Sequence, residues 1–300
     1  MMGLNKKATT TAVLAVLLAS SLVFPAPGQI HAASSEVSTT TAVIAGADKA
    51  KLYAPGSTHN ASSYGEIADI VFNVMSNNYG DRVTIKFKGD TSGIDKKLQQ
   101  VFKDVGSKDD YMRFVLKKMN WSWTSTASEA TIEYGMTYWE TPEQSEAVRQ
   151  EARKALTDKT ISGKQGKEHL QAIYEWVIGR LRYDSSLDDH SAYAGLFGAN
   201  GTVCQGYALL LQRMLEEAGY ENRMVYGSAK GDLHIWNLVK LNGTWLHLDT
   251  TLDDPGAGRS KLSYFLKSDA VLEKDHSWDR TAYPRSGAEL KAAAMRSLKL

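Results

Sequence analysis

An Asn-Gly pair at residues 242–243 separates two segments of alternating character, 234–241 and 244–249. A two-residue loop of this composition between alternating segments is the strongest short-range signal for a β-hairpin. Such a turn pairs Leu241 with Thr244. Because a shift of one residue would move every side chain to the other face, this register constrains the fold more than any other local pattern in the chain.

Counted back along both strands, this register sets Trp236 opposite Asp249 and His234 opposite Thr251. Opposed residues point to the same side of a sheet. His234, Trp236 and Asp249 are therefore predicted to share one face, with Asp249 diagonal to His234. Diagonal neighbours are about 7–8 Å apart, which a carboxylate and an imidazole can span.

The other histidines have weaker functional claims. His247 falls on the same face but opposite Leu238, and we expect it to be packed or solvated. Since it does not oppose His234, a metal site shared by these two is disfavoured, and the sequence predicts no metal and no cofactor. His190 and His276 are expected to be surface or structural residues.

Cys204 is the only cysteine, and it stands where a helix is expected to begin. Apolar residues at helical spacing follow it, and Gly219 is a typical C-terminal stop. Amide groups and the positive dipole end of a helix N-terminus favour a thiolate, and the same amides can donate to an oxyanion. The alternative is a small buried cysteine that happens to precede a helix.

The N-terminus is typical of an export signal. Lys6 and Lys7 precede an apolar run, 11–24, and a small-residue site follows just before Ala33. We therefore expect residues 1–32 to be a cleaved signal peptide and the protein to be secreted, with no integral membrane span. One cysteine excludes an internal disulfide, and a net charge of +1 offers no case for a nucleic-acid partner.

Composition and periodicity divide the remaining chain into three parts. Residues 33–63 are predicted to be a flexible linker, residues 64–140 a small N-terminal α+β region of unknown role, and residues 141–300 the domain that carries the chemistry. The acidic run 249–254 is interpreted as a solvated loop rather than a calcium site. The individual expectations are helical spacing at 67–74, a strand at 82–88, an apolar-periodic stretch at 94–119, a strand at 130–139, and helices at 141–156 and 170–181.

Four motifs between about Thr141 and His276 together resemble the transglutaminase-like superfamily, in the family's order of Cys, His and Asp. They are Ser191-Ala192-Tyr193, Val203-Cys204-Gln205-Gly206-Tyr207-Ala208, His234-Ile235-Trp236-Asn237 and Asp249-Thr250-Thr251-Leu252-Asp253-Asp254-Pro255. The family often has Pro and Trp where this chain has Thr250 and Leu252, which affects the expected substrate channel more than the reacting groups. The resemblance implies an α+β fold with a papain-like transglutaminase core, in which a helix carrying the cysteine packs on an antiparallel sheet.

The resemblance also implies roles for the site residues. Cys204 would be the nucleophile, His234 the base and Asp249 the orienting group; Gln205, Gly206, Tyr207 and Trp236 are candidate substrate-binding or oxyanion residues. The expected activity is acyl transfer on protein amides through a thioester, from a glutamine side chain to an amine or water. The alternatives are a cysteine peptidase or amidase with the same triad, or a weakly active binding or scaffold module of the cell envelope. The expected partner is a protein or peptide substrate, and association with the cell envelope is a further hypothesis.

Overall fold

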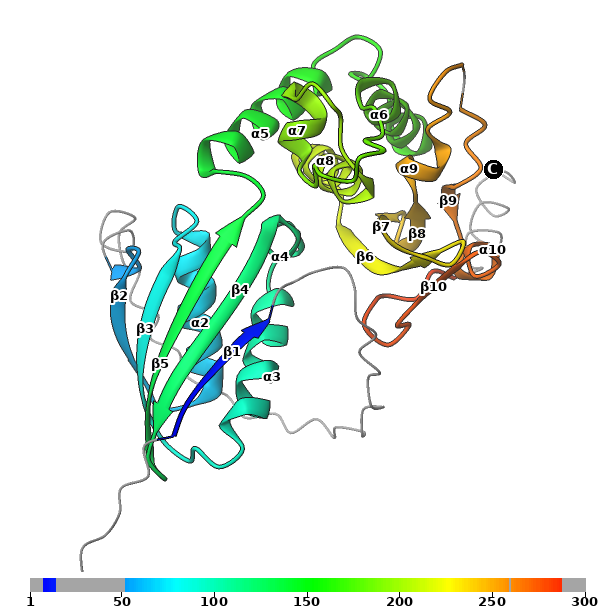
Figure 1. Ribbon diagram of the computed structural model, residues 1–300. Helices are drawn as coiled ribbons and strands as arrows, with labels where there is room; N and C mark the ends of the chain where they lie inside the picture. Colours follow the sequence, from blue (N-terminus) through cyan, green and yellow to red (C-terminus); the bar gives the residue numbers. More distant parts are fainter. Residues whose placement is uncertain (1–7, 15–51, 259, 288–300) are drawn as a thin grey trace, which may run out of the picture. The chain divides into compact units, whose positions relative to one another are not determined.

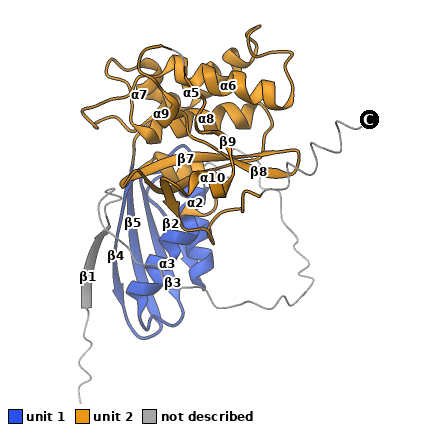
Figure 2. Ribbon diagram, turned by 90° about the vertical axis from the view of Figure 1, so that its right-hand side faces the viewer, with its two compact units in different colours: residues 1–105, 117–137 blue, residues 106–116, 138–300 orange. Residues whose placement is uncertain are grey.

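The computed structural model describes residues 8–14, 52–258 and 260–287, the first of these as backbone only. The chain divides into two compact units (Figure 2). Unit 1 comprises residues 1–105 and 117–137, and unit 2 comprises residues 106–116 and 138–300. Among the described helices, none combines the length and apolar composition needed to cross a bilayer.

Unit 1 is built on a five-stranded sheet in the order β1-β4-β5-β3-β2, with two helices on one face (Figure 1). β2 and β3 are parallel, whereas β1 with β4 and β3 with β5 are antiparallel. Alternate residues of the strands are buried, such as Val83, Ile85 and Phe87, as half-buried strands require. The elements are β1 (Ala8–Leu14), β2 (Ser57–Ala61), α2 (Tyr64–Ser76), β3 (Arg82–Lys88), α3 (Ile94–Gly106), β4 (Leu116–Ser125) and β5 (Glu129–Tyr138).

Three expectations about the N-terminal half differ from the structure. Residues 57–61 of the expected linker form β2. This segment is polar and shows no apolar alternation, and its backbone hydrogen bonds are provided by pairing with β3. The periodic stretch 94–119 is broken after Gly106, and its last residues begin β4. Residues 106–116, which include α4 (Asp110–Val115), cluster with unit 2. Much of the expected leader and linker, 1–7 and 15–51, lies outside the described residues; Ala8–Leu14 forms β1.

Unit 2 places a layer of helices against a second five-stranded sheet, in the order β10-β6-β7-β8-β9 (Figure 1). All of its strand pairs are antiparallel. α8 lies against β6 and β7, and its residues 205–215 are all buried. The remaining elements are α5 (Pro142–Leu156), α6 (Gly166–Arg180), α7 (Ala192–Phe197), α8 (Cys204–Glu217), β6 (Asn222–Ala229), β7 (Asp232–Leu241), β8 (Thr244–Leu248), α9 (Thr250–Asp253), β9 (Phe265–Lys267), α10 (Asp269–Leu272) and β10 (His276–Trp278).

The predicted hairpin register is confirmed where the two strands pair. Leu241 pairs with Thr244, and both turn residues have positive φ, 49° at Asn242 and 79° at Gly243. The ladder ends one step earlier than predicted, at Asn237 with Leu248. The expected pairs of Trp236 with Asp249 and of His234 with Thr251 are therefore wrong, because the chain leaves the sheet after Leu248 to begin α9.

Candidate active site

Cys204 is the first residue of α8, as the sequence predicted. Gly206 and Tyr207 donate their amides to the Val203 carbonyl at 3.0 and 3.3 Å, so the amides of Cys204 and Gln205 precede the first hydrogen bond of the helix. Cys204 itself is partly exposed, whereas the helix behind it is buried. A buried helix thus holds one partly exposed cysteine in a fixed position, at the end where the helix dipole is positive.

Gly206 permits the close packing that fixes this helix end. A Cβ at that position would lie 2.0 Å from Thr202 Oγ1 and 2.5 Å from the Ser191 carbonyl oxygen. No side chain fits there without moving backbone. The glycine therefore contributes through packing beneath the first turn of α8.

His234 lies on β7 opposite Gly227 of β6 and is only 7% exposed. Its Nε2 is 2.7 Å from Asp249 Oδ2, and its other hydrogen-bond partner is the Cys204 thiol. Three residues along the same strand, Asn237 donates to the Ala208 carbonyl of α8 at 3.0 Å. That bond ties the strand that carries the imidazole to the helix that carries the thiol.

Asp249 follows β8 and caps α9, and it is 1% exposed. Its Oδ1 accepts the Leu252 amide at 3.0 Å, while Oδ2 faces His234 Nε2 and also His276 Nε2, at 3.1 Å. The Asp249 carbonyl oxygen accepts the Tyr174 hydroxyl at 2.5 Å. The carboxylate is therefore held on both oxygens, and its residue is held through the backbone as well.

The electrostatics of this pair favour an ionised couple. Burial by itself lowers the pKa of His234, but the charge of Asp249 and hydrogen bonds to Asp249 and Cys204 outweigh it and raise the pKa to about 10. Burial raises the pKa of Asp249, yet the charge of His234 and its hydrogen bonds hold that pKa well below its ordinary value. At neutral pH the structure therefore supports an imidazolium between the Asp249 carboxylate and the Cys204 sulfur.

His234, Asp249 and His276 bring one nitrogen or oxygen atom each within 4.8 Å of the others, a grouping that suggests a metal. Two ligands of a tetrahedral zinc, each about 2.0–2.2 Å from the ion, are roughly 3.3–3.6 Å apart. The contacts of Asp249 Oδ2, at 2.7 Å to His234 and 3.1 Å to His276, are shorter than that. They have the lengths of direct hydrogen bonds, and we interpret the three residues in that way.

Trp236 and His247 form a second layer beneath the imidazole. The rings of His234 and Trp236 are stacked with centroids 6.0 Å apart. The Trp236 indole donates to His247 Nδ1 at 2.9 Å, so Nδ1 must be unprotonated, and Nε2 donates to Asp269 at 2.8 Å. Burial lowers the pKa of His247 to about 4, which keeps this ring neutral.

Three of the side chains expected near substrate donate hydrogen bonds to other groups of the protein. Gln205 donates to the Phe114 carbonyl at 2.7 Å, Tyr207 donates to Asp254, and Trp236 donates to His247. We therefore do not assign these side chains to substrate or to an oxyanion. The backbone amides of the first turn of α8 fit the oxyanion role instead.

One sequence interpretation requires correction, and two histidines can now be placed. The acidic run is not a solvated loop: Asp253 is buried and accepts the Tyr174 hydroxyl at 2.7 Å and the Tyr264 amide at 2.8 Å. Of the two expectations for His276, surface or structural, the structure supports the second, since the residue is buried against Asp249. His190 is half-buried and stacks on Trp139, with ring centroids 4.4 Å apart.

Comparison with known proteins agrees with the motifs. Residues 153–250, which include all three reacting candidates, match the family model of the Transglutaminase-like superfamily. The resemblance seen in the sequence is therefore confirmed for this segment. The α+β class is confirmed as well, with the cysteine helix packed on an antiparallel sheet.

Two curated relatives and one solved structure are similar to parts of the chain. The Kyphoscoliosis peptidases of Homo sapiens and Mus musculus are each 29% identical over 153 aligned positions, which cover 40% of this chain and 22% of each relative. The chain thus spans under a quarter of the length of those relatives. A crystal structure of a TGase covers 68% of this chain and 61% of its own, at 14% identity and a TM-score of 0.33. The family assignment rests on the sequence match.

Proposed function

We propose that this protein is a secreted cysteine enzyme that transfers acyl groups from protein amides through a thioester on Cys204. One observation carries the proposal: His234 lies between the Cys204 thiol and the buried Asp249, with Nε2 2.7 Å from Oδ2. Covalent catalysis by a thiol requires a base in contact with the nucleophile and a third group that orients the base. The transglutaminase-like match of residues 153–250 supports the same reaction class.

The chemistry follows from these three groups. The Cys204 sulfur attacks the carbonyl carbon of an amide, and the oxyanion is stabilised by amides at the start of α8. His234 donates its proton to the departing nitrogen, the C–N bond breaks, and the thioester forms. An amine or water then attacks the thioester, gives its proton to His234, and releases Cys204 as thiolate.

Asp249 acts through His234 in both half-reactions. Its hydrogen bond to Nε2 directs the other ring nitrogen toward the sulfur and stabilises the protonated ring. No further residue has to gain or lose a proton, so the cycle closes on the starting thiolate and imidazolium.

The acceptor decides between transfer and hydrolysis. The relatives named peptidase favour a hydrolytic enzyme as the second candidate, either a peptidase or an amidase with the same triad. A weakly active module of the cell envelope is the third candidate. A partly exposed thiol beside an ion pair of His and Asp favours an enzyme, because a scaffold does not require that arrangement.

A single incubation separates these candidates. The protein without residues 1–32 is mixed with a glutamine-rich protein and a fluorescent primary amine, and product mass and ammonia are followed together. Amine incorporation with ammonia release supports transfer; ammonia alone indicates deamidation; shortened substrate indicates a peptidase. Cys204→Ala should abolish every product, and His169→Gln, which changes a histidine bonded to Tyr220, should retain them. Absence of all products in the wild type would contradict the proposal.

A further inference from the structure

A second histidine is bound to the carboxylate that orients His234. His276 is the first residue of β10 and pairs with Ala229 of β6. Two residues earlier on β6, Gly227 pairs with His234 of β7. The side chain of His276 is fully buried. Its Nε2 lies 3.1 Å from Asp249 Oδ2, the same oxygen that is 2.7 Å from His234 Nε2.

Gly227 makes this approach of three strands sterically feasible. A Cβ at Gly227 would lie 2.2 Å from the Ser277 carbonyl oxygen and 2.9 Å from Cη2 of Trp236. The ring of Trp236 in turn meets that of His276 edge to face, with centroids 4.9 Å apart. The bare backbone of β6 at this position therefore lets β10 come close enough for His276 to reach the catalytic candidate Asp249.

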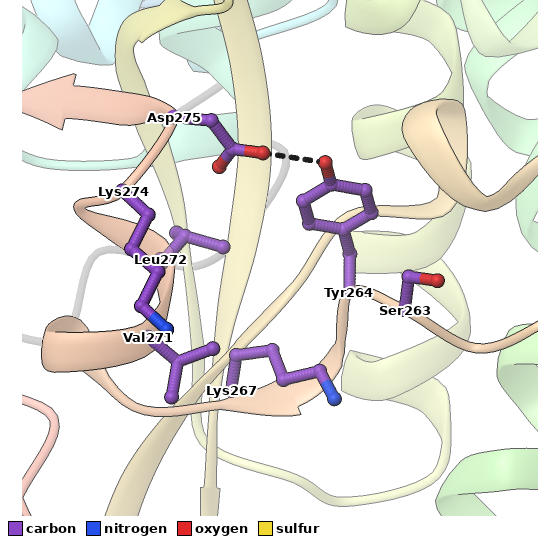
Figure 3. A pocket seen from close by; sticks show the side chains of 7 residues that line it. All are labelled: Ser263, Tyr264, Lys267, Val271, Leu272, Lys274 and Asp275. Carbon is purple, nitrogen blue, oxygen red and sulfur yellow. Dashed lines mark hydrogen bonds between the residues drawn. The ribbon is translucent and has the colours of Figure 1, made fainter.

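The other ring nitrogen of His276 also meets a carboxylate. Nδ1 is 2.7 Å from Asp275 Oδ1, and Asp275 Oδ2 accepts the Tyr264 hydroxyl at 2.6 Å. Tyr264 and Asp275 line a pocket of about 210 Å³ (Figure 3), so this end of the hydrogen-bonded chain lies at a hollow in the surface of unit 2. The chain runs continuously from Tyr264 through Asp275, His276 and Asp249 to His234.

Hydrogen-bond chemistry determines which ring nitrogens of His276 donate. An ionised carboxylate only accepts, so a ring with a carboxylate oxygen at each nitrogen must donate from both. Burial raises the pKa of Asp275, but the bonds to Tyr264 and His276 outweigh it and lower the pKa. The pKa of Asp249 is lowered as well, so each of the two carboxylates accepts one hydrogen bond from the His276 ring.

We propose that His276 is a positioning residue for the triad: it fixes the Asp249 carboxylate by donating to the same oxygen that faces His234, and it reduces the negative charge that Asp249 presents to His234. This inference rests on the proposed acyl transfer, since its effect is exerted on the Cys204–His234 pair. The first consequence is orientation, because two donors on Oδ2 and one on Oδ1 leave the carboxylate a single position. The second is electrostatic, because a shared carboxylate holds the proton of His234 less tightly and releases it more readily to a leaving nitrogen.

Other charged groups near His276 do not reproduce this effect. Asp249 and Asp275 contact it directly, and the His234 ring lies at 5.9 Å. His247 is held neutral by burial, and Lys230, 5.8 Å from the Tyr264 ring, acts on the outer carboxylate of Asp275. Among these described neighbours, His276 is the one outside the triad that donates to Asp249 Oδ2.

The test compares His276→Ala with His276→Gln. Alanine removes the donor to Asp249, and we expect turnover to fall about 10- to 100-fold, as for the loss of one charge-assisted hydrogen bond. Glutamine keeps an N–H donor to Asp249 but loses the second donor of the ring, so it should restore most of the turnover. Asp249 should nevertheless present more of its negative charge to His234 in this variant, which raises the pKa of His234 and moves the corresponding limb of the pH profile to higher pH.

The rate of Cys204 alkylation by iodoacetamide is measured across pH on the same variants, because this readout does not require acyl transfer. Asp275→Asn tests the carboxylate at the outer end of the hydrogen-bonded chain. The residue is partly exposed, so the substitution leaves no cavity in the core, and it should shift the pH profile of alkylation measurably. Ser277→Ala is the control, since it changes an exposed neighbour on β10 that bonds only across to Ser228 in this region.

The outcomes distinguish this inference from the proposed function. A wild type without acyl transfer, but with an alkylation profile that shifts in His276→Gln, would support the role of His276 and contradict the proposed reaction. Wild-type turnover together with superimposable profiles for wild type, His276→Gln and Asp275→Asn would overturn the role of His276 and leave the reaction in place. Thermal unfolding of each variant shows whether a loss reflects misfolding, and a folded His276→Ala with full turnover would also overturn the inference.

Discussion

Asp249 joins two tasks in one side chain, because Oδ1 caps α9 and Oδ2 faces His234. Asparagine is also a good helix cap, so Asp249→Asn should preserve the local fold. It removes the charge that stabilises the imidazolium, and we expect kcat to fall roughly 10³- to 10⁴-fold. Steady-state kinetics of amide turnover, with circular dichroism to verify folding, measure the effect. His169→Gln is the matched control, and an equal loss in both folded variants would contradict the assignment of Asp249.

The raised pKa of His234 makes a prediction about stability and pH. A group whose pKa is higher in the folded state than in the unfolded state stabilises the fold below the unfolded value, about 6.5 for histidine. That contribution is lost as pH rises through the folded value, about 10. Urea unfolding at several pH values between 6 and 11 should therefore show wild type losing more stability than His234→Gln over this range. Parallel curves for the two proteins would show that His234 is not protonated in the fold.

At the level of elements, Gln205 ties α8 to α4 rather than facing substrate. Its side-chain amide donates to the Phe114 carbonyl in the interior of unit 2. Gln205→Met keeps similar volume but leaves that buried carbonyl without its donor, which should lower the free energy of unfolding by about 1–3 kcal/mol. KM should change little. Gln171→Met, at an exposed bond to Glu175 on α6, is the control, and a large rise in KM at unchanged stability would show that Gln205 contacts substrate.

The elements that the sequence predicted best are those defined by local chemistry. Asn242 and Gly243 form a turn that requires positive φ at two successive residues. This local requirement alone predicts the register of β7 and β8. Thr141 and Gln144 form the expected capping box at the start of α5. The helix beginning at Cys204 was predicted in the same way, from apolar spacing and a glycine stop.

What the sequence did not show depends on contacts between distant segments. His276 lies 27 residues beyond Asp249 in a three-residue strand, which is too short to display a period, and only the pairing of β10 with β6 brings the two together. α4 was expected in the N-terminal region, yet Asp110 accepts Arg223 Nε at 2.6 Å and the Met224 amide at 2.9 Å. Nothing near Asp110 in the sequence indicates that its partners are on β6.

At the level of the whole molecule, export remains a prediction that can be measured directly. We expect cleavage after Ala32, because a basic start, an apolar run and a small-residue site precede it. Cleavage there removes β1, and the sheet of unit 1 then ends on β4. Sequencing the N-terminus of the protein collected outside the cell should find Ala33 first. A secreted chain that still begins with Met1 would contradict the prediction.

The hydrogen bonds of Asp249 also bear on how activity could be lost over evolutionary time. The thiol of Cys204 stands partly exposed, so an ancestor that abandoned the reaction could replace it with little effect on folding. Asp249 is different, because α9 and the buried His276 depend on it whether or not a reaction takes place. Inactive descendants would therefore lose the cysteine first and retain the aspartate for its structural role. An aspartate at this position in another sequence is accordingly weaker evidence of catalytic activity than a cysteine at the start of the helix.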